Sequence, residues 1–182
     1  ENFYGFTKLE CEKLLEWFSR VHDINFAALR YFNAAGYSKG KMMEKNAGNL
    51  LPIVMEVASE RRPILEIYGD DYDTLDGTGV RDYIHVLDIA DAHVKAIDYV
   101  ISGENNLIVN LSTGKGHSVM EIVYLARELL NHDIDCTVAP RRLGDPGTVV
   151  ASNQLARNIL DWEPKNSDIN NIILSMWEVY KK

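Results

Sequence analysis

Short apolar runs that alternate with helical stretches constrain the fold of this chain more than any other feature. Residues 26–32 and 107–111 have the length and apolar character of strands that are buried on both faces. Residues 4–21 and 87–101 instead repeat their apolar side chains at the spacing of an amphipathic helix. A helix followed by a buried strand is typical of βαβ units, so the sequence predicts an α/β fold.

The rest of the chain continues this alternation. Ser118 and Glu121 have the spacing of a capping box, which predicts a helix from there to Leu130. The Ala-Ala-Gly sequence at 34–36 ends the first helix–strand unit, and we expect a domain boundary near Gly36. Further helices are predicted over 49–60, 154–160 and 168–180, strands over 64–68 and 135–139, and loops over 38–48 and 69–79.

Composition and charge exclude several classes of protein. A hydrophobic share of 46% and a charged share of 25% are those of an ordinary globular protein, and the net charge of −8 argues against a nucleic-acid binder. An acidic protein can still bind an anion where a few arginines gather. No apolar run approaches the roughly 18 residues of a membrane span, and no signal-peptide pattern is present. We therefore expect a cytoplasmic protein, and the spacing of its His and Cys residues predicts no metal site.

Tyr4 and Lys8 are one helical turn apart on the first predicted helix, so their side chains share one face. A neighbouring ammonium stabilises a phenolate, and such a pair can take a proton from a hydroxyl group. Tyr37 and Lys41 have the same spacing but lie in a predicted loop, where a shared face is not expected. The alternative for either pair is an exposed Tyr and Lys without chemistry.

Arg81 is the best candidate for an anion-binding side chain. Its guanidinium offers a planar fork of donors that suits a diphosphate, and Gly77 and Gly79 allow the backbone to approach a ligand closely. A second candidate is the adjacent arginine pair that ends in Arg142 and precedes Asp145, since a cation and a carboxylate there can hold a phosphate and a ribose hydroxyl. The alternatives are an arginine paired with surrounding acids and a turn with solvated charges.

The order of these motifs resembles that of the extended short-chain dehydrogenase/reductase superfamily. The resemblance rests on Tyr4-Gly5-x-x-Lys8 followed by Leu29-Arg30-Tyr31-Phe32-Asn33-x-x-Gly36. The segment 68–86, Tyr-Gly-x-Asp-Tyr-x-Thr-x-Asp-Gly-Thr-Gly-Val-Arg-Asp-Tyr-Ile-His-Val, is similar to that of UDP-glucose 4-epimerases in particular. Related dehydratases and decarboxylases usually carry a shorter version of this loop.

The resemblance implies an NAD-dependent enzyme that interconverts UDP-glucose and UDP-galactose through a transient 4-keto sugar. It implies that Tyr4 is the catalytic acid/base, that Lys8 holds the nicotinamide ribose, and that Phe32 contacts the cofactor. Arg142 is implied to bind the diphosphate and Asp145 the uridine ribose. The substrate-binding residues implied by the resemblance are Asn33, Asn49, Leu50, Glu66, Ile67, Tyr68, Arg81, Tyr83, Arg142, Asp145 and Val149.

The resemblance also implies that the chain is a C-terminal portion of a longer enzyme. Residues 1–36 would end a Rossmann-like NAD-binding domain, and residues 37–182 would form mainly a UDP-sugar-binding subdomain. The Gly-rich turn for the NAD pyrophosphate is absent, so we expect the chain to be inactive by itself. Members commonly form homodimers through the catalytic helix, so Tyr4–Val21 is expected to pack on a second copy or in an internal core. The alternatives are a related dehydratase or decarboxylase, and a non-catalytic UDP-sugar-binding module.

Overall fold

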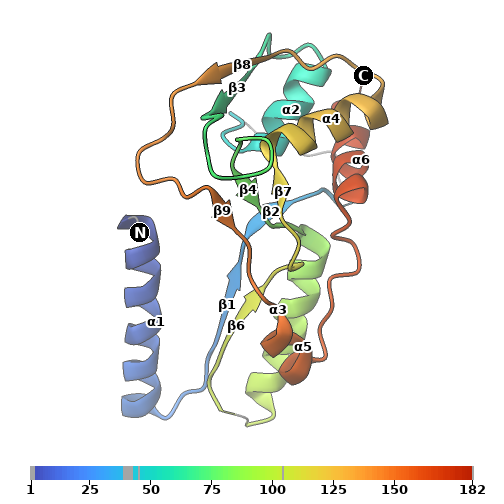
Figure 1. Cartoon of the computed structure of the whole chain (residues 1–182). Helices are drawn as coiled ribbons and strands as arrows, with labels where there is room; N and C mark the ends of the chain where they lie inside the picture. Colours follow the sequence, from blue (N-terminus) through green and yellow to red (C-terminus); the bar gives the residue numbers. More distant parts are fainter. Residues whose placement is uncertain (1–2, 39–42, 45, 104, 182) are drawn as a thin grey trace.

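The computed structural model describes residues 3–38, 43–44, 46–103 and 105–181, so Lys41 of the second Tyr–Lys pattern lies outside it. Figure 1 shows one main body of helices and strands, with the first helix standing apart beside it. The helices are α1 (Phe3–His22), α2 (Leu50–Ala58), α3 (Val86–Ile101), α4 (Val119–Leu130), α5 (Gln154–Leu160) and α6 (Ile169–Tyr180). The strands are β1 (Ala27–Tyr31), β2 (Asn33–Ala35), β3 (Leu65–Tyr68), β4 (Val80–Arg81), β5 (Tyr83–His85), β6 (Leu107–Leu111), β7 (His117–Ser118), β8 (Cys136–Ala139) and β9 (Thr148–Val149).

Most of the strand pairs in the fold are parallel. β1 pairs with β6 over its whole length, with Ala27 opposite Leu107 and Tyr31 opposite Leu111. β2 pairs with β5 and β3 with β8, again in parallel. β4 lies between β7 and β9, antiparallel to the first and parallel to the second. Parallel pairs that are connected through helices confirm the predicted α/β class.

The predicted helices are confirmed to within two residues, and the capping box of Ser118 and Glu121 is formed. The prediction was wrong for the shortest strands. The predicted run 26–32 contains only β1, and β2, β4, β5, β7 and β9 were not predicted. Each missed strand has only two or three residues, which is too short to show an alternating pattern. These strands exist because a distant segment supplies their hydrogen-bond partner.

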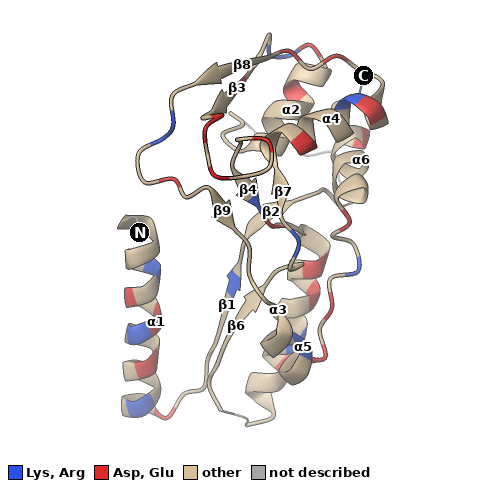
Figure 2. Cartoon of the chain, viewed as in Figure 1, with Lys and Arg blue, Asp and Glu red and all other residues tan. Residues whose placement is uncertain are grey.

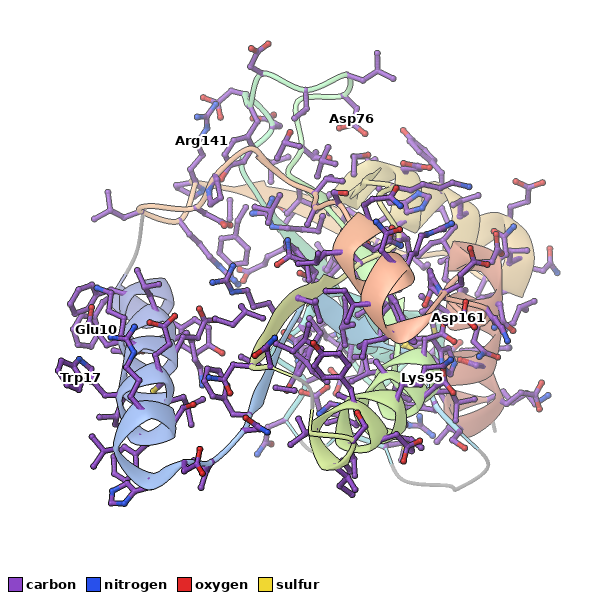
Figure 3. All side chains as sticks on the ribbon, turned by 90° about the horizontal axis from the view of Figure 1, so that it is seen from below. Glu10, Trp17, Asp76, Lys95, Arg141 and Asp161 are labelled. Carbon is purple, nitrogen blue, oxygen red and sulfur yellow. The ribbon has the colours of Figure 1, made fainter. Side chains whose placement is uncertain are left out.

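Two clusters of buried apolar side chains hold the main body together. One lies among α2, α4 and α6 and includes the wholly buried Met55 and Ile122. The other lies where α3 and α5 cover β6 and includes the wholly buried Trp162. Lys95 of α3 donates a hydrogen bond of 2.8 Å to the carbonyl oxygen of Asp161, which joins these two helices (Figure 3). The short strands β2, β4, β7 and β9 lie between the clusters in Figure 1.

Helix α1 buries none of its residues in the described part of the chain, and Trp17 points away from the main body in Figure 3. Its contacts to that body include polar ones. Arg30 Nε donates to Glu12 Oε1 at 2.7 Å, and this hydrogen bond lowers the pKa of Glu12. The expected internal core around this helix is therefore not formed by the described residues. The exposed large apolar side chains of α1 are Phe3, Tyr4, Phe6, Leu9, Leu14, Leu15, Trp17, Phe18 and Val21.

Candidate functional site

One polar cavity of about 170 Å³ brings together all of the predicted substrate-binding residues except Val149. It lies among β3, β4, the start of α2 and the segment between β8 and β9. Figure 2 shows basic and then acidic residues along that last segment, beside the acidic loop that follows β3. The residues that line the cavity are Asn33, Gly48, Asn49, Leu50, Ile53, Leu65, Glu66, Ile67, Tyr68, Tyr72, Gly79, Arg81, Tyr83, Val119, Arg142 and Asp145.

Arg81 is held on β4 by three acceptors. Its Nη1 donates to the carbonyl oxygens of Val80 at 2.8 Å and Gly147 at 3.3 Å, and its Nη2 donates to Asp145 Oδ1 at 2.6 Å. The Arg81 side chain is only 16% exposed. The alternative of an arginine paired with an acid is therefore confirmed, and anion binding by Arg81, which also lines the cavity, stays a prediction.

The buried carboxylate of Asp82 fixes the position of β4. It accepts hydrogen bonds from the Thr113 amide at 2.9 Å, the Thr113 hydroxyl at 2.7 Å and the Gly114 amide at 3.0 Å. The Asp82 amide donates to the Val149 carbonyl at 3.1 Å, and the Asn33 amide donates to the Asp82 carbonyl at 3.0 Å. Asp82, which directly follows β4, therefore links that strand to β9 and β2. Predicted site residues lie on all three strands, namely Arg81, Val149 and Asn33. Next to it, burial raises the pKa of Tyr83, so this phenol stays neutral.

The loop over 69–79 is tied to the start of α4. Asp76 Oδ1 accepts from the Thr78 amide at 2.9 Å, and Asp76 Oδ2 accepts from the Ser118 hydroxyl. Burial acts to raise the pKa of Asp76, but the hydrogen bonds from Ser118 and Thr78 outweigh it, and the pKa is lowered. Gly77 has φ +78°, and a Cβ there would lie 2.0 Å from the Asp70 carbonyl oxygen. The glycine is therefore needed for this tight loop, on which Figure 3 labels Asp76.

Aromatic and charged side chains meet where β3 approaches the segment after β8. The Arg142 guanidinium lies over the Tyr68 ring, with Cζ 3.9 Å from the ring centroid. The Tyr68 hydroxyl donates to Glu66 Oε2 at 2.8 Å. The Glu66 side chain therefore orients Tyr68, a role that the sequence did not indicate. A planar base could stack on these groups, since every base presents a π face to an aromatic ring or a guanidinium.

The predicted cofactor contacts do not line this cavity. Tyr4 is 69% exposed on α1, and Lys8 Nζ lies 5.3 Å from its ring centroid. The predicted shared face of this pair is thus confirmed. Phe32 is half-buried between β1 and β2. Val149 is also half-buried, and it lies opposite Arg81 in the β4–β9 pair.

A second cavity, of about 440 Å³, adjoins the first at Asn49 but is lined mainly by apolar groups. Its lining contains neither Arg81 nor Arg142, so the smaller polar cavity is the better anion site. Among the described residues, no cluster of His, Cys, Asp and Glu side chains could hold a metal ion. None of the described helices combines the length and apolar character that a membrane span requires.

Several lining residues were not identified from the sequence. Tyr72 stands inside the segment 68–86, so the signal that pointed to Arg81 also covered it, and Gly79 had been named there only for the backbone approach that it allows. The others lie on apolar stretches, where a residue that contacts a ligand has the same pattern as one in the core. These are Ile53, Leu65 and Val119, together with Gly48 in the loop before α2.

Known relatives were found by sequence comparison. Residues 1–112 match the NAD dependent epimerase/dehydratase family. The chain is 44% identical over 179 residues to the UDP-glucose 4-epimerase of Lacticaseibacillus casei, covering 97% of this chain and 54% of that protein. It is 40% identical over 184 residues to the UDP-glucose 4-epimerase of Halalkalibacterium halodurans, covering 100% and 55%. The chain thus spans about half the length of the curated relatives it matches.

Solved structures have the same fold. The UDP-glucose 4-epimerase from Brucella ovis in complex with NAD superimposes with a TM-score of 0.91 at 40% identity, covering 97% of this chain and 55% of that one. The enzyme from Bifidobacterium longum in complex with NAD+ and UDP superimposes with a TM-score of 0.90 at 36% identity, covering 98% and 54%. Because the family match spans more than half of the residues, this chain belongs to the NAD dependent epimerase/dehydratase family.

Proposed function

We propose that this chain is the UDP-sugar-binding part of a UDP-hexose 4-epimerase and that it also supplies the acid/base Tyr4. The observation that carries the proposal is the single cavity in which Arg81, Arg142 and Asp145 meet β3 and the start of α2. A diphosphate needs clustered donors, and a ribose needs a carboxylate acceptor close by. The chain's similarity to UDP-glucose 4-epimerases supports this assignment.

The nucleotide would occupy the charged end of the cavity. Arg81 and Arg142 bind the diphosphate, Asp145 accepts a hydrogen bond from the uridine ribose, and residues 66–68 hold the uracil. The Arg142–Tyr68 stack supports this placement, since it offers a flat cationic surface beside β3. The hexose would then extend toward Asn33, Asn49 and Leu50, which line the same cavity.

The chemical step would need NAD, and the bound cofactor would supply the hydride acceptor and donor for C4 of the sugar. Tyr4 as phenolate takes the proton of the 4-hydroxyl group, and Lys8, on the same helix face, holds that phenolate and the nicotinamide ribose. Phe32 would contact the bound cofactor. While the 4-keto sugar turns over, Arg81, Arg142 and Asp145 keep the UDP in place, and Tyr4 then returns the proton.

The chemistry of a nicotinamide ribose suits Tyr4, Lys8 and Phe32. These three residues do not by themselves form a binding site for the whole dinucleotide. In the described structure Tyr4 lies on an exposed helix face, outside the cavity. This favours a second candidate function for the chain by itself, namely binding of UDP-sugars without turnover. A related NAD-dependent dehydratase or decarboxylase is the other alternative, and product analysis distinguishes it from an epimerase.

We assign residues 1–36 to the end of the NAD-binding domain and residues 37–182 mainly to the UDP-sugar-binding subdomain. Residues 37–182 also contribute to the first domain, because β6 pairs with β1 and β5 pairs with β2. The exposed apolar residues of α1 support a homodimer through Tyr4–Val21, and a cytoplasmic location suits a nucleotide-sugar enzyme. The resemblance places Val149 beside the sugar, where a small side chain would also admit N-acetylated hexosamines, although Val149 does not line the cavity in this structure. An enzyme of this sequence that is inert toward UDP-GlcNAc would contradict the last point.

Calorimetry on the 182-residue chain tests the proposal with UDP, UDP-glucose, UDP-galactose and NAD as titrants. We expect UDP and both UDP-sugars to bind with similar affinities, because one UDP site anchors all three. Arg142→Ala should abolish this binding, whereas Arg20→Ala, on α1 and stacked on Trp17, should leave it unchanged. Absence of UDP binding would contradict the assigned site. Stoichiometric NAD binding would contradict the expectation that this chain carries only part of an NAD-binding site.

A further inference from the structure

The hydroxyl group of Tyr72 is the one buried side-chain polar atom without a hydrogen-bond partner among the described residues. Tyr72 lines the polar cavity, and the residue is 7% exposed. A buried polar group without a partner destabilises a folded protein, so native proteins pair nearly all such groups with protein, water or a ligand. This hydroxyl group therefore requires an explanation.

The ring of Tyr72 is held in place from several sides. The Arg141 guanidinium lies over it, with Cζ 4.1 Å from the ring centroid, and Arg141 also forms an ion pair with Asp71. A Cβ atom on Gly69 would lie 2.8 Å from Tyr72 Cε2, and one on Gly147 would lie 3.2 Å from Cδ1. The two glycines therefore allow the ring to fit between β3 and β9. Figure 3 shows Arg141 on the segment beside the acidic loop.

The carboxylates near this ring already accept hydrogen bonds from other donors. Asp145 accepts from Arg81, and Asp71 accepts from Arg141. Glu66, which also lines the cavity, accepts from Tyr68. A phenol hydroxyl with a guanidinium stacked on its ring is suited to donate to an acceptor, and no described protein group supplies that acceptor.

We propose that the Tyr72 hydroxyl donates a hydrogen bond to an acceptor oxygen of the bound nucleotide, a contact that rests on the function proposed above. Tyr72 lies against Gly69 and Gly147, which follow Tyr68 and Asp145 closely in the chain. It therefore belongs to the nucleotide end of the cavity and not to the end at Asn33 and Asn49. The acceptor is an oxygen of the uridine or of its phosphate.

Tyr72→Phe tests the proposal, because it removes only the hydroxyl group. We expect the affinity of the 182-residue chain for UMP to fall about tenfold, the cost of one lost hydrogen bond and of its desolvated partner. Without ligand, the melting temperature should stay the same or rise, since the unpaired buried hydroxyl is gone. Tyr124→Phe, an exposed tyrosine on α4, is the matched control and should change neither quantity.

Titration with uridine and with UMP locates the acceptor. A loss of affinity for both ligands assigns it to the nucleoside, and a loss for UMP alone assigns it to the phosphate. Unchanged UMP affinity in Tyr72→Phe, together with binding lost in Arg142→Ala, would overturn this proposal and leave the nucleotide site standing. A lower melting temperature of unliganded Tyr72→Phe would also overturn it in favour of a structural role. Failure of the unsubstituted chain to bind UMP would instead overturn the site itself.

Discussion

Arg81 Nη2 lies 2.6 Å from Asp145 Oδ1, so the two residues assigned to the diphosphate and the ribose are bound to each other. The pair joins β4 to the segment before β9 across 64 positions of the chain. Because the guanidinium also donates to the Val80 and Gly147 carbonyl oxygens, its plane is set before any ligand arrives. Such preorganisation reduces the entropy that binding would otherwise lose.

This arrangement makes Arg81→Lys a sharp test of anion binding. A lysine keeps the charge, but its single ammonium cannot reach three acceptors in the plane that a guanidinium defines. We expect UDP affinity, measured by calorimetry, to fall by about ten- to a hundredfold while the fold is retained. Arg157→Lys serves as the control, since that arginine pairs with Glu163 away from this cavity. Equal UDP affinity of Arg81→Lys and the unsubstituted chain would remove Arg81 from the site.

Gly36→Ala should destabilise the protein for a steric reason. Gly36 has φ +79°, and a Cβ there would lie 2.2 Å from Cδ2 of the buried His85 ring. Gly103 has a similar φ of +81°, but a Cβ there would have no neighbour within 4 Å. A substitution at Gly103 therefore measures the backbone strain without the clash. We expect a loss of about 1 kcal/mol in unfolding free energy for Gly103→Ala and about 3 kcal/mol or more for Gly36→Ala. Equal losses in urea denaturation would show that the clash is relieved.

His85 should make stability depend on pH. Burial lowers the pKa of His85, and the Asp88 carboxylate opposes this shift only in part. The unfolded chain therefore binds a proton near pH ~6.5, where the folded protein resists it. The unfolding free energy should thus fall as the pH falls from about 7.5 to about 5.5, by at most about 1.4 kcal/mol per pH unit from this group.

His85→Asn provides the comparison for that pH dependence. In the folded protein His85 Nδ1 accepts from the Leu87 amide at 3.1 Å and thereby caps α3, and an asparagine oxygen can take the same place. Urea denaturation across the pH range should give a shallower slope for His85→Asn than for the unsubstituted chain. Identical slopes would show that another group is responsible.

The exposed apolar face of α1 should cause self-association of the isolated chain. Leu14 and Trp17 are 57% and 64% exposed and lie three positions apart, so they share a face. We expect sedimentation velocity to show association that increases with concentration and that Leu14→Glu/Trp17→Glu abolishes. Leu75→Glu, on a fully exposed loop position outside α1, should have no effect. A chain that stays monomeric throughout would contradict the homodimer through Tyr4–Val21.

Much of the site could be predicted from the sequence because the relevant side chains stand in short continuous motifs. Arg81, Arg142 and Asp145 were each identified by residue type and spacing, and all three line one cavity. Tyr72 was not identified, although it stands in the same segment, because an aromatic side chain between polar neighbours does not reveal whether its hydroxyl has a partner. The burial and the missing hydrogen bond are tertiary properties.

The sequence by itself determined the α/β class, the helices and the longer strands, since periodicity and capping act within a few residues. Only the tertiary structure decided the short strands β2, β4, β5, β7 and β9, the Arg81–Asp145 pair and the exposure of α1. Each of these depends on which distant segment lies alongside. β4, for example, has only two residues and exists because β7 and β9 supply its hydrogen bonds. Pairing across dozens of residues leaves no local pattern, so it is visible only in the folded chain.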